Sequence, residues 1–132
     1  VLKRLIAEAD LSSNIEFLGH VETDELRELY RTCGVFVFPS TVETFGNPLV
    51  EAMACGAPIA SSNSAAMPEV LGDAAEFFDP NDVDDMCATI SGLISDQDQR
   101  ERLSAAARDR AARYSWQETK RQTLEVIMGK TG

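Results

Sequence analysis

The stretch VFVFPSTVETFGNPLVEA, residues 35–52, decides how the rest of the chain is read. Val35–Phe38 is a continuous apolar run that ends at Pro39, which is typical of a strand buried on both faces of a parallel sheet. Pro48 suits the first position of a helix, and Gly56 suits the position just past its end. We therefore predict a buried strand, then a loop, then a helix.

The loop between this strand and this helix has the features of an anion site. Gly46 lets a ligand approach the backbone closely. The amides around Gly46, Asn47 and Leu49 lie at the start of the helix, where unpaired N–H groups and the helix dipole favour an anion. Ligands of parallel sheets bind at the carboxyl ends of strands. A diphosphate is the natural occupant.

Two carboxylates frame the expected anion site, Glu43 in the loop and Glu51 near the start of the helix. Carboxylates repel phosphate, so we expect them to accept hydrogen bonds from sugar hydroxyls instead. One on each side of a diphosphate suits a nucleotide-sugar, with ribose at one end and the transferred sugar at the other. Two other readings are a solvated Glu43 beside a Glu51 that complements the helix dipole, and a glycosidase-like acid/base pair. The second is disfavoured, because such a pair needs no amide-rich helix start.

Strands and helices alternate up to Asp79, which indicates a parallel sheet with crossover helices. We expect strands at 15–19, 35–38, 57–61 and 76–78, and helices at 1–11, 23–32, 48–55, 68–71, 83–95, 97–113 and 116–128. The charged run from Asp98 to Arg113 is interpreted as a solvated helix face.

Composition narrows the class of protein. The 132 residues suit one domain, and the net charge of −10 argues against nucleic acid and against a basic membrane-docking surface. Cys33, Cys55 and Cys87 lack metal-ligand spacing and are interpreted as small buried hydrophobes in a reducing compartment. Asp82 and Asp84 begin a helix, so they are no metal motif at a strand end.

The segment from Pro39 to Pro58 resembles the signature of the retaining GT-B glycosyltransferases called family 4 or group 1. Glu43 and Glu51 stand at its Glu-x7-Glu spacing, around Phe-Gly and before Ala-x-Gly-x-Pro. The further matching segments are Phe17–Val21, Met67–Val70, Gly72–Ala75, Phe78–Pro80 and Tyr114–Trp116. Together they run over nearly the whole chain. One departure is Ala65-Ala66, where many relatives have Gly-Gly; that form resembles a mannosyltransferase-like subgroup.

The resemblance implies an α/β, Rossmann-like parallel sheet followed by C-terminal helices, the C-terminal half of a GT-B fold. Residues 1–132 would be a partial nucleotide-sugar-binding domain, with the sheet and the site in 1–80 and a helical part in 81–132. The first two strands of the domain and the N-terminal acceptor domain are expected outside this chain. Sheet edges left unpaired would favour association into homo-oligomers. The segment alone is expected neither to transfer sugar nor to bind donor tightly.

The function implied by the resemblance is transfer of a hexosyl group from a nucleotide-diphosphate sugar to an acceptor, with retention at the anomeric carbon. It implies polysaccharide biosynthesis in the cytoplasm or at the cytoplasmic face of the membrane, with no metal and no cofactor besides the donor substrate. Glu43 would lie near the donor sugar as the catalytic residue, and Glu51 would bind the ribose hydroxyls. The other implied donor-binding residues are Gly19, His20, Thr44, Phe45, Gly46, Asn47 and Leu49.

Three points stay open at the level of sequence. His20 either lies beside the base or is a strand-end residue with no special role. A non-catalytic nucleotide or phosphate-binding module with a flavodoxin-like sheet is an alternative function, and a nucleotide-sugar epimerase of GT-B fold is another. The sequence does not determine the base, the sugar or the acceptor, although the Ala65-Ala66 form resembles that of a mannosyltransferase-like subgroup.

Overall fold

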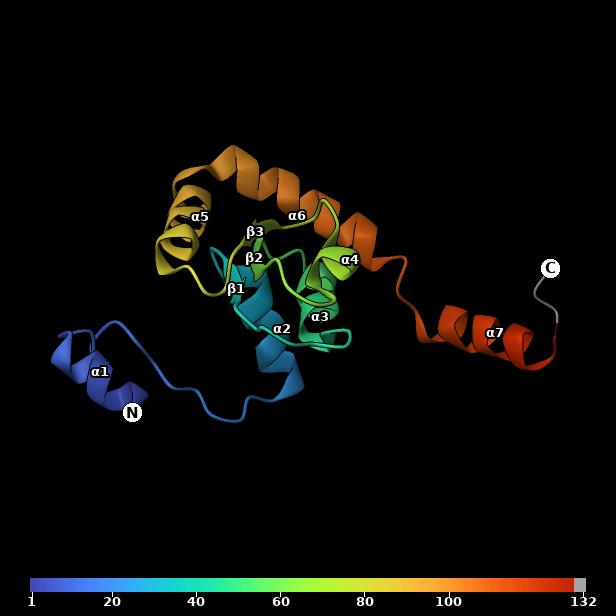
Figure 1. Cartoon of the computed structure of the whole chain (residues 1–132), viewed down its shortest axis with the longest axis horizontal. Helices are drawn as coiled ribbons and strands as arrows, with labels where there is room; N and C mark the ends of the chain where they lie inside the picture. The colour runs from blue at the N-terminus through green and yellow to red at the C-terminus, as the bar shows by residue number, and fades with distance from the viewer. Residues whose placement is uncertain (130–132) are drawn as a thin grey trace.

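The computed structural model describes residues 1–129, and residues 130–132, the end of the predicted domain, lie outside this range. The alternation of strands and helices is confirmed. The elements are α1 (Leu2–Glu8), α2 (Thr23–Thr32), β1 (Phe36–Phe38), α3 (Asn47–Cys55), β2 (Ile59–Ser62), α4 (Met67–Leu71), β3 (Glu76–Phe78), α5 (Val83–Ser95), α6 (Gln97–Ala111) and α7 (Trp116–Ile127). Their order is shown in Figure 1.

The three strands form one parallel sheet in the order β1-β2-β3. Phe36 is paired with Ile59, and Ser62 is paired with Phe78, so β2 lies in the middle. All four residues of β2 are buried, whereas β1 is only half-buried. The prediction that residues 35–38 are buried on both faces is met in part: Phe36 and Phe38 pack against one core and Val35 and Val37 against another, but each strand residue is only half-buried.

Alternate side chains of the sheet enter two separate cores. Ile59 joins Leu49 and Met53 of α3 in the first core, while Ala60 joins Leu93 of α5 in the second. Helix α6 packs against both cores, with Leu103 in the second and Ala107 in the first. The sheet thus lies between two helical layers, with α2 and α3 on one side and α5 on the other, as Figure 1 shows.

Arginines of α6 tie the helical layers together. Arg110 donates from Nε to the carbonyl of Val70 at 2.6 Å and from Nη2 to the carbonyl of Glu69, and Arg100 donates to the carbonyl of Leu93 at 2.5 Å. The last carbonyls of a helix lack partners within it, so a cation there satisfies them and complements the dipole. The interpretation of 98–113 as a wholly solvated face is wrong for these arginines.

The expected strand at 15–19 is also wrong. This segment is extended, but it belongs to neither edge of the sheet, and Figure 1 shows it running between α1 and α2 away from β1. A strand needs a neighbouring strand for its backbone hydrogen bonds, and within residues 1–129 this segment has none. Phe17 and Leu18 accordingly stay exposed.

Smaller expectations were met unevenly. Helix α2 begins at Thr23 as expected, with Glu22 at the cap position. The cysteines are free, and the expectation that all three are buried is wrong, because Cys33 and Cys55 are half-buried and Cys87 is exposed.

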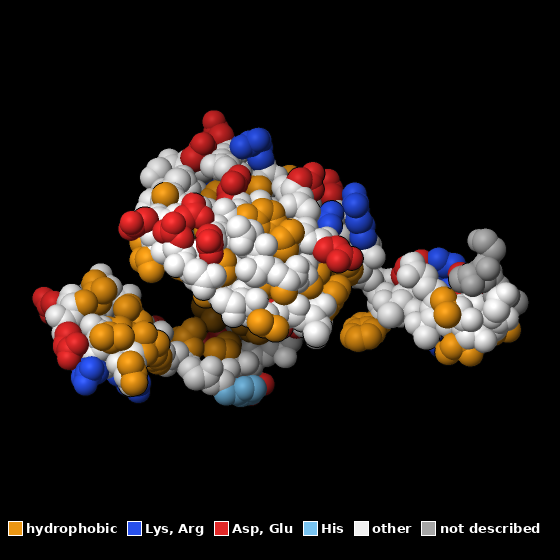
Figure 2. All heavy atoms as spheres, in the orientation of Figure 1, with side chains coloured by type: hydrophobic (Ala, Val, Ile, Leu, Met, Phe, Trp, Pro, Cys, Tyr) orange, Lys and Arg blue, Asp and Glu red, His pale blue; other side chains and the backbone are white. Residues whose placement is uncertain are grey.

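The surface carries charged side chains over parts of the body and exposed apolar side chains towards both ends. Figure 2 shows Asp and Glu side chains gathered over α5 and apolar side chains exposed on α1. Helix α7 buries none of its residues, and it extends away from the sheet in Figure 1. Of the helices in residues 1–129, none is long and apolar enough to span a bilayer.

Substitution of Ala65 tests the backbone conformation of the loop after β2. Ala65 has a φ of 49°, a left-handed conformation, whereas the next residue, Ala66, has an ordinary φ of −80°. A left-handed non-glycine residue costs roughly 1–2 kcal/mol, more than the about 0.4–1 kcal/mol of extra chain entropy that glycine gives the unfolded state. We expect Ala65→Gly to raise the free energy of unfolding by about 0.5–1 kcal/mol in urea denaturation.

Ala66→Gly is the matched control. Its φ needs no glycine, so this change should lower the free energy of unfolding by about 0.4–1 kcal/mol. Equal losses in both variants would contradict the assigned conformation of Ala65.

Candidate functional site

The loop that follows β1 is held by a hydrogen bond from the end of β2. The hydroxyl of Ser62, at the buried end of β2, donates to the carbonyl of Ser40 at 2.5 Å. The hydroxyl of Ser40 in turn lies 3.2 Å from the Val42 carbonyl and 3.3 Å from Oε1 of Glu43, so its one proton is shared between these two acceptors. Register explains this contact, because Phe38 is paired with Ser61, so the chain leaving β1 passes beside Ser62. The Glu43 carboxylate is therefore tethered near the carboxyl edge of the sheet.

The turn at Gly46 begins α3. Gly46 has a φ of 82° and caps the helix without any side-chain hydrogen bond, and a Cβ at this position would lie 2.9 Å from Cδ1 of Leu49. The Leu49 amide donates to the Gly46 carbonyl at 2.9 Å, so it is not free for a ligand. Within residues 1–129 the amides of Gly46 and Asn47 have no acceptor. Two amides, rather than the expected three, are unpaired at this helix start; Asn47 is exposed and lines the cleft described next, whereas Gly46 is buried.

A cleft of about 570 Å³ opens beside the start of α3. The α3 side of the cleft is formed by Phe45, Asn47 and Glu51. The opposite wall comes from the junction of α6 and α7 and from the first turns of α7, where Tyr114 and Trp116 lie. Glu51 is exposed, and its carboxylate adds to the effect of burial in raising the pKa of Tyr30 on α2.

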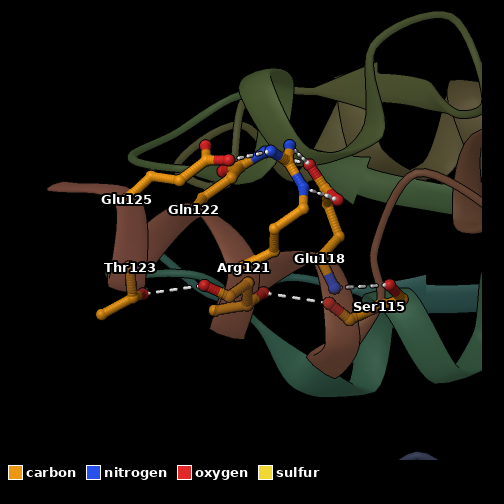
Figure 3. A network of polar contacts seen from close by, with 7 residues as sticks. Ser115, Glu118, Arg121, Gln122, Thr123 and Glu125 are labelled. Atoms are coloured by element: carbon orange, nitrogen blue, oxygen red, sulfur yellow. Dashed lines mark hydrogen bonds and ion pairs between the residues drawn. The ribbon is translucent and has the colours of Figure 1, made fainter. Parts of the chain in front are cut away.

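The α7 wall of the cleft is organised by a polar network, drawn in Figure 3. Ser115 caps the helix by accepting from the Glu118 amide at 3.1 Å. Arg121 donates from Nε to Glu118 at 2.8 Å and from Nη1 to Glu125 at 2.7 Å. The hydrogen bonds from Arg121 and then from Gln122 lower the pKa of Glu118 to about 2, so this carboxylate is ionised beside the cleft at neutral pH.

The structure brings only some of the predicted site residues together. Phe45, Asn47 and Glu51 line one cleft, whereas Glu43 does not line it and is bonded to Ser40 instead. Gly19 and His20 do not line the cleft either; His20 is exposed, with Nε2 3.7 Å from the Glu22 carboxylate. Leu49 is fully buried beneath the turn. Nowhere in residues 1–129 do three or more His, Cys, Asp or Glu side chains gather as a metal site would require.

Sequence reasoning missed the contribution of the segment between α6 and α7. The ring of Tyr114 lies edge-on to that of Phe45, with centroids 5.5 Å apart at 75°. Tyr114 belongs to one of the segments that match the family, but it lies 69 positions beyond Phe45 in the chain. No periodicity or spacing rule connects residues so distant, so only the fold brings them together.

Comparison with known proteins agrees on one family. A family model described as "Glycosyl transferases group 1" matches residues 1–110. O-antigen chain mannosyltransferase B of Escherichia coli is 40% identical over 126 residues, which cover 96% of this chain and 33% of that protein. The chain thus spans about a third of the length of this relative.

Two solved structures share the fold. Sucrose-phosphate synthase from Thermosynechococcus elongatus superposes with a TM-score of 0.87 at 23% identity, covering 98% of this chain and 34% of that one. HepE from Anabaena, solved in complex with UDP, superposes with a TM-score of 0.85 at 22% identity, covering 98% and 36%. The predicted Rossmann-like sheet of GT-B type is confirmed at this level.

Replacement of Gly46 tests the turn on which the site is built. Gly46→Ala places a side chain in the left-handed region and against the buried Leu49, so we expect the free energy of unfolding to fall by about 1–2 kcal/mol in urea denaturation. Gly34→Ala is the control, because a Cβ at Gly34 meets nothing within 4 Å. A loss no larger than that of the control would show that the turn does not need glycine.

Proposed function

This chain belongs to the group 1 glycosyl transferases, and from that membership we propose that the protein transfers a hexosyl group from a nucleotide-diphosphate sugar to an acceptor with retention at the anomeric carbon. We propose that residues 1–132 supply the donor-binding part of this reaction. The observation that carries the proposal is the glycine-capped start of α3, whose two unpaired amides lie next to the cleft that Glu51 lines.

Diphosphate recognition is assigned to the start of α3. The Gly46 and Asn47 amides point from a helix N-terminus that no acidic side chain occupies in its first turn. Such a helix end favours a dianionic group through its free N–H groups and its dipole. Donors fixed in this way stabilise the charge that develops on the departing diphosphate, which lowers the barrier to transfer.

The two carboxylates are proposed to act at opposite ends of the donor. Glu51 lies on the cleft wall and would accept hydrogen bonds from the ribose hydroxyls. Glu43, held by Ser40 outside that cleft, would lie by the transferred sugar. The two carboxylates lie in different surroundings, which supports different roles for them. Two carboxylates that faced the same cleft would be expected to bind the same group of the ligand. We propose no metal in this step.

Mannose is the proposed sugar and a nucleoside diphosphate the proposed leaving group. The E. coli relative at 40% identity is a mannosyltransferase, and a second relative, from Mycolicibacterium hassiacum, is named an alpha-(1->4)-mannosyltransferase at 36% identity. HepE was solved with UDP and with UDP-glucose. Cytoplasmic polysaccharide synthesis is proposed on the same basis. The acceptor is left open.

Two substitutions in the full-length protein separate the proposed roles. Glu51→Ala removes a charged acceptor for ribose hydroxyls, worth about 1.5–3 kcal/mol, so nucleoside diphosphate should bind about 10- to 150-fold more weakly in calorimetry. Glu43→Ala should leave that affinity within about threefold but lower kcat for a nucleotide-mannose donor about 100-fold or more.

Glu28→Ala is the control, since Glu28 is an exposed residue of α2 that does not line the cleft. It should change neither affinity nor kcat. Equal and small effects of Glu51→Ala and Glu43→Ala would contradict the assigned roles. If the unsubstituted protein binds neither UDP nor GDP, the donor-binding proposal itself fails.

A further inference from the structure

The loop of the anion site has few attachments of its own. In the described part of the chain, its hydrogen bonds involve Ser40, Val42, Glu43 and the Gly46 carbonyl, and none involves Thr44 or Phe45. Gly46 follows directly, and glycine has more accessible backbone conformations than any other residue. An anchor on Phe45 is therefore needed if the amides of Gly46 and Asn47 are to keep one orientation.

Tyr114 is positioned to be that anchor. Its ring lies edge-on to Phe45 at a centroid distance of 5.5 Å, an arrangement that aromatic pairs favour beyond the area they bury. Both residues line the same cleft as Glu51. Phe45 is 39% exposed as a residue, so it is not locked by burial in either core.

The tyrosine itself is fixed by elements that do not include the loop. Its amide donates to the Ala111 carbonyl at 2.9 Å, and its hydroxyl donates to the Val70 carbonyl at 3.0 Å. The same carbonyl receives Nε of Arg110. Tyr114 is thus held on two sides, by the end of α6 and by the end of α4. Its ring therefore keeps a fixed position against the loop.

We propose that Tyr114 is a positioning residue for donor binding, which holds Phe45 and through it the backbone amides at the start of α3. This inference rests on the proposed function for its ligand. Tyr114 need not touch the diphosphate. It reduces the number of conformations that the loop loses on binding, and pre-ordering of this kind raises affinity without a new contact with the ligand.

The test uses the full-length protein with para-fluorophenylalanine at position 45, followed by fluorine NMR without ligand. In the parent the fluorine resonance should be displaced from that of a solvent-exposed ring. Tyr114→Leu should move it to the exposed value. Tyr114→Phe keeps the ring but loses the hydroxyl bond to Val70, so it should retain most of the displacement.

Calorimetry with UDP and GDP on the same variants, without the fluorine label, gives the second readout. Tyr114→Leu and Phe45→Leu should each weaken binding about three- to tenfold, the range expected for one aromatic pair. Because the two rings act together, the double variant should be no weaker than either single one. Tyr114→Phe should recover affinity to within about twofold. Leu93→Val, which trims the second core far from the loop, should lower Tm but leave affinity unchanged.

The outcomes separate the two proposals. An unmoved fluorine resonance in Tyr114→Leu overturns the positioning role, as does a loss of affinity in Leu93→Val as large as in Tyr114→Leu. If Tyr114→Leu does not fold, the affinities of Phe45→Leu and Tyr114→Phe for UDP and GDP decide the question. An unchanged affinity in Phe45→Leu then overturns the positioning role. If the parent binds neither UDP nor GDP, the proposed function fails, whereas the fluorine resonance still reports whether Tyr114 holds Phe45.

Discussion

The turn at Gly46 directs the start of α3 towards the carboxyl edge of the sheet, and the candidate site follows from that turn. A left-handed residue there leaves the Gly46 and Asn47 amides without partners, while Leu49 is drawn beneath the turn into the first core. One short segment thereby contains both the proposed ligand-binding amides and a side chain of the core. A side chain at position 46 would meet Leu49, so the site and the core constrain the same residue.

Support for this turn comes from distant parts of the chain. Ser62 holds the loop from the end of β2, and Tyr114 contacts it from the end of α6. Helix α6 is itself joined to α4 by Arg110. Hydrogen bonds from an arginine to helix-end carbonyls, partly buried here, satisfy groups that have no partner within the helix. The same contacts that order the helical layers therefore also order one wall of the cleft.

The sequence predicted those elements whose ends are set by local signals alone. Pro48 and Gly56 delimited α3 closely, and Asp82 begins α5 by accepting from the amides of Asp84 and Asp85. The expected strand at 15–19 failed because a strand also needs a partner, which local sequence cannot supply. The contact between Phe45 and Tyr114 and the arginine bonds of α6 depend on tertiary packing. The side-chain direction of Glu43 depends on a hydroxyl tether that no spacing rule encodes.

Binding of the donor diphosphate at the start of α3 is tested by a crystal structure of the full-length protein with UDP or GDP bound. We predict a phosphate oxygen within hydrogen-bonding distance, about 2.7–3.2 Å, of the amide nitrogen of Gly46 or Asn47, with a ribose hydroxyl on the Glu51 carboxylate. A diphosphate bound elsewhere, with both amides facing solvent and Glu51 free of the ribose, would contradict it.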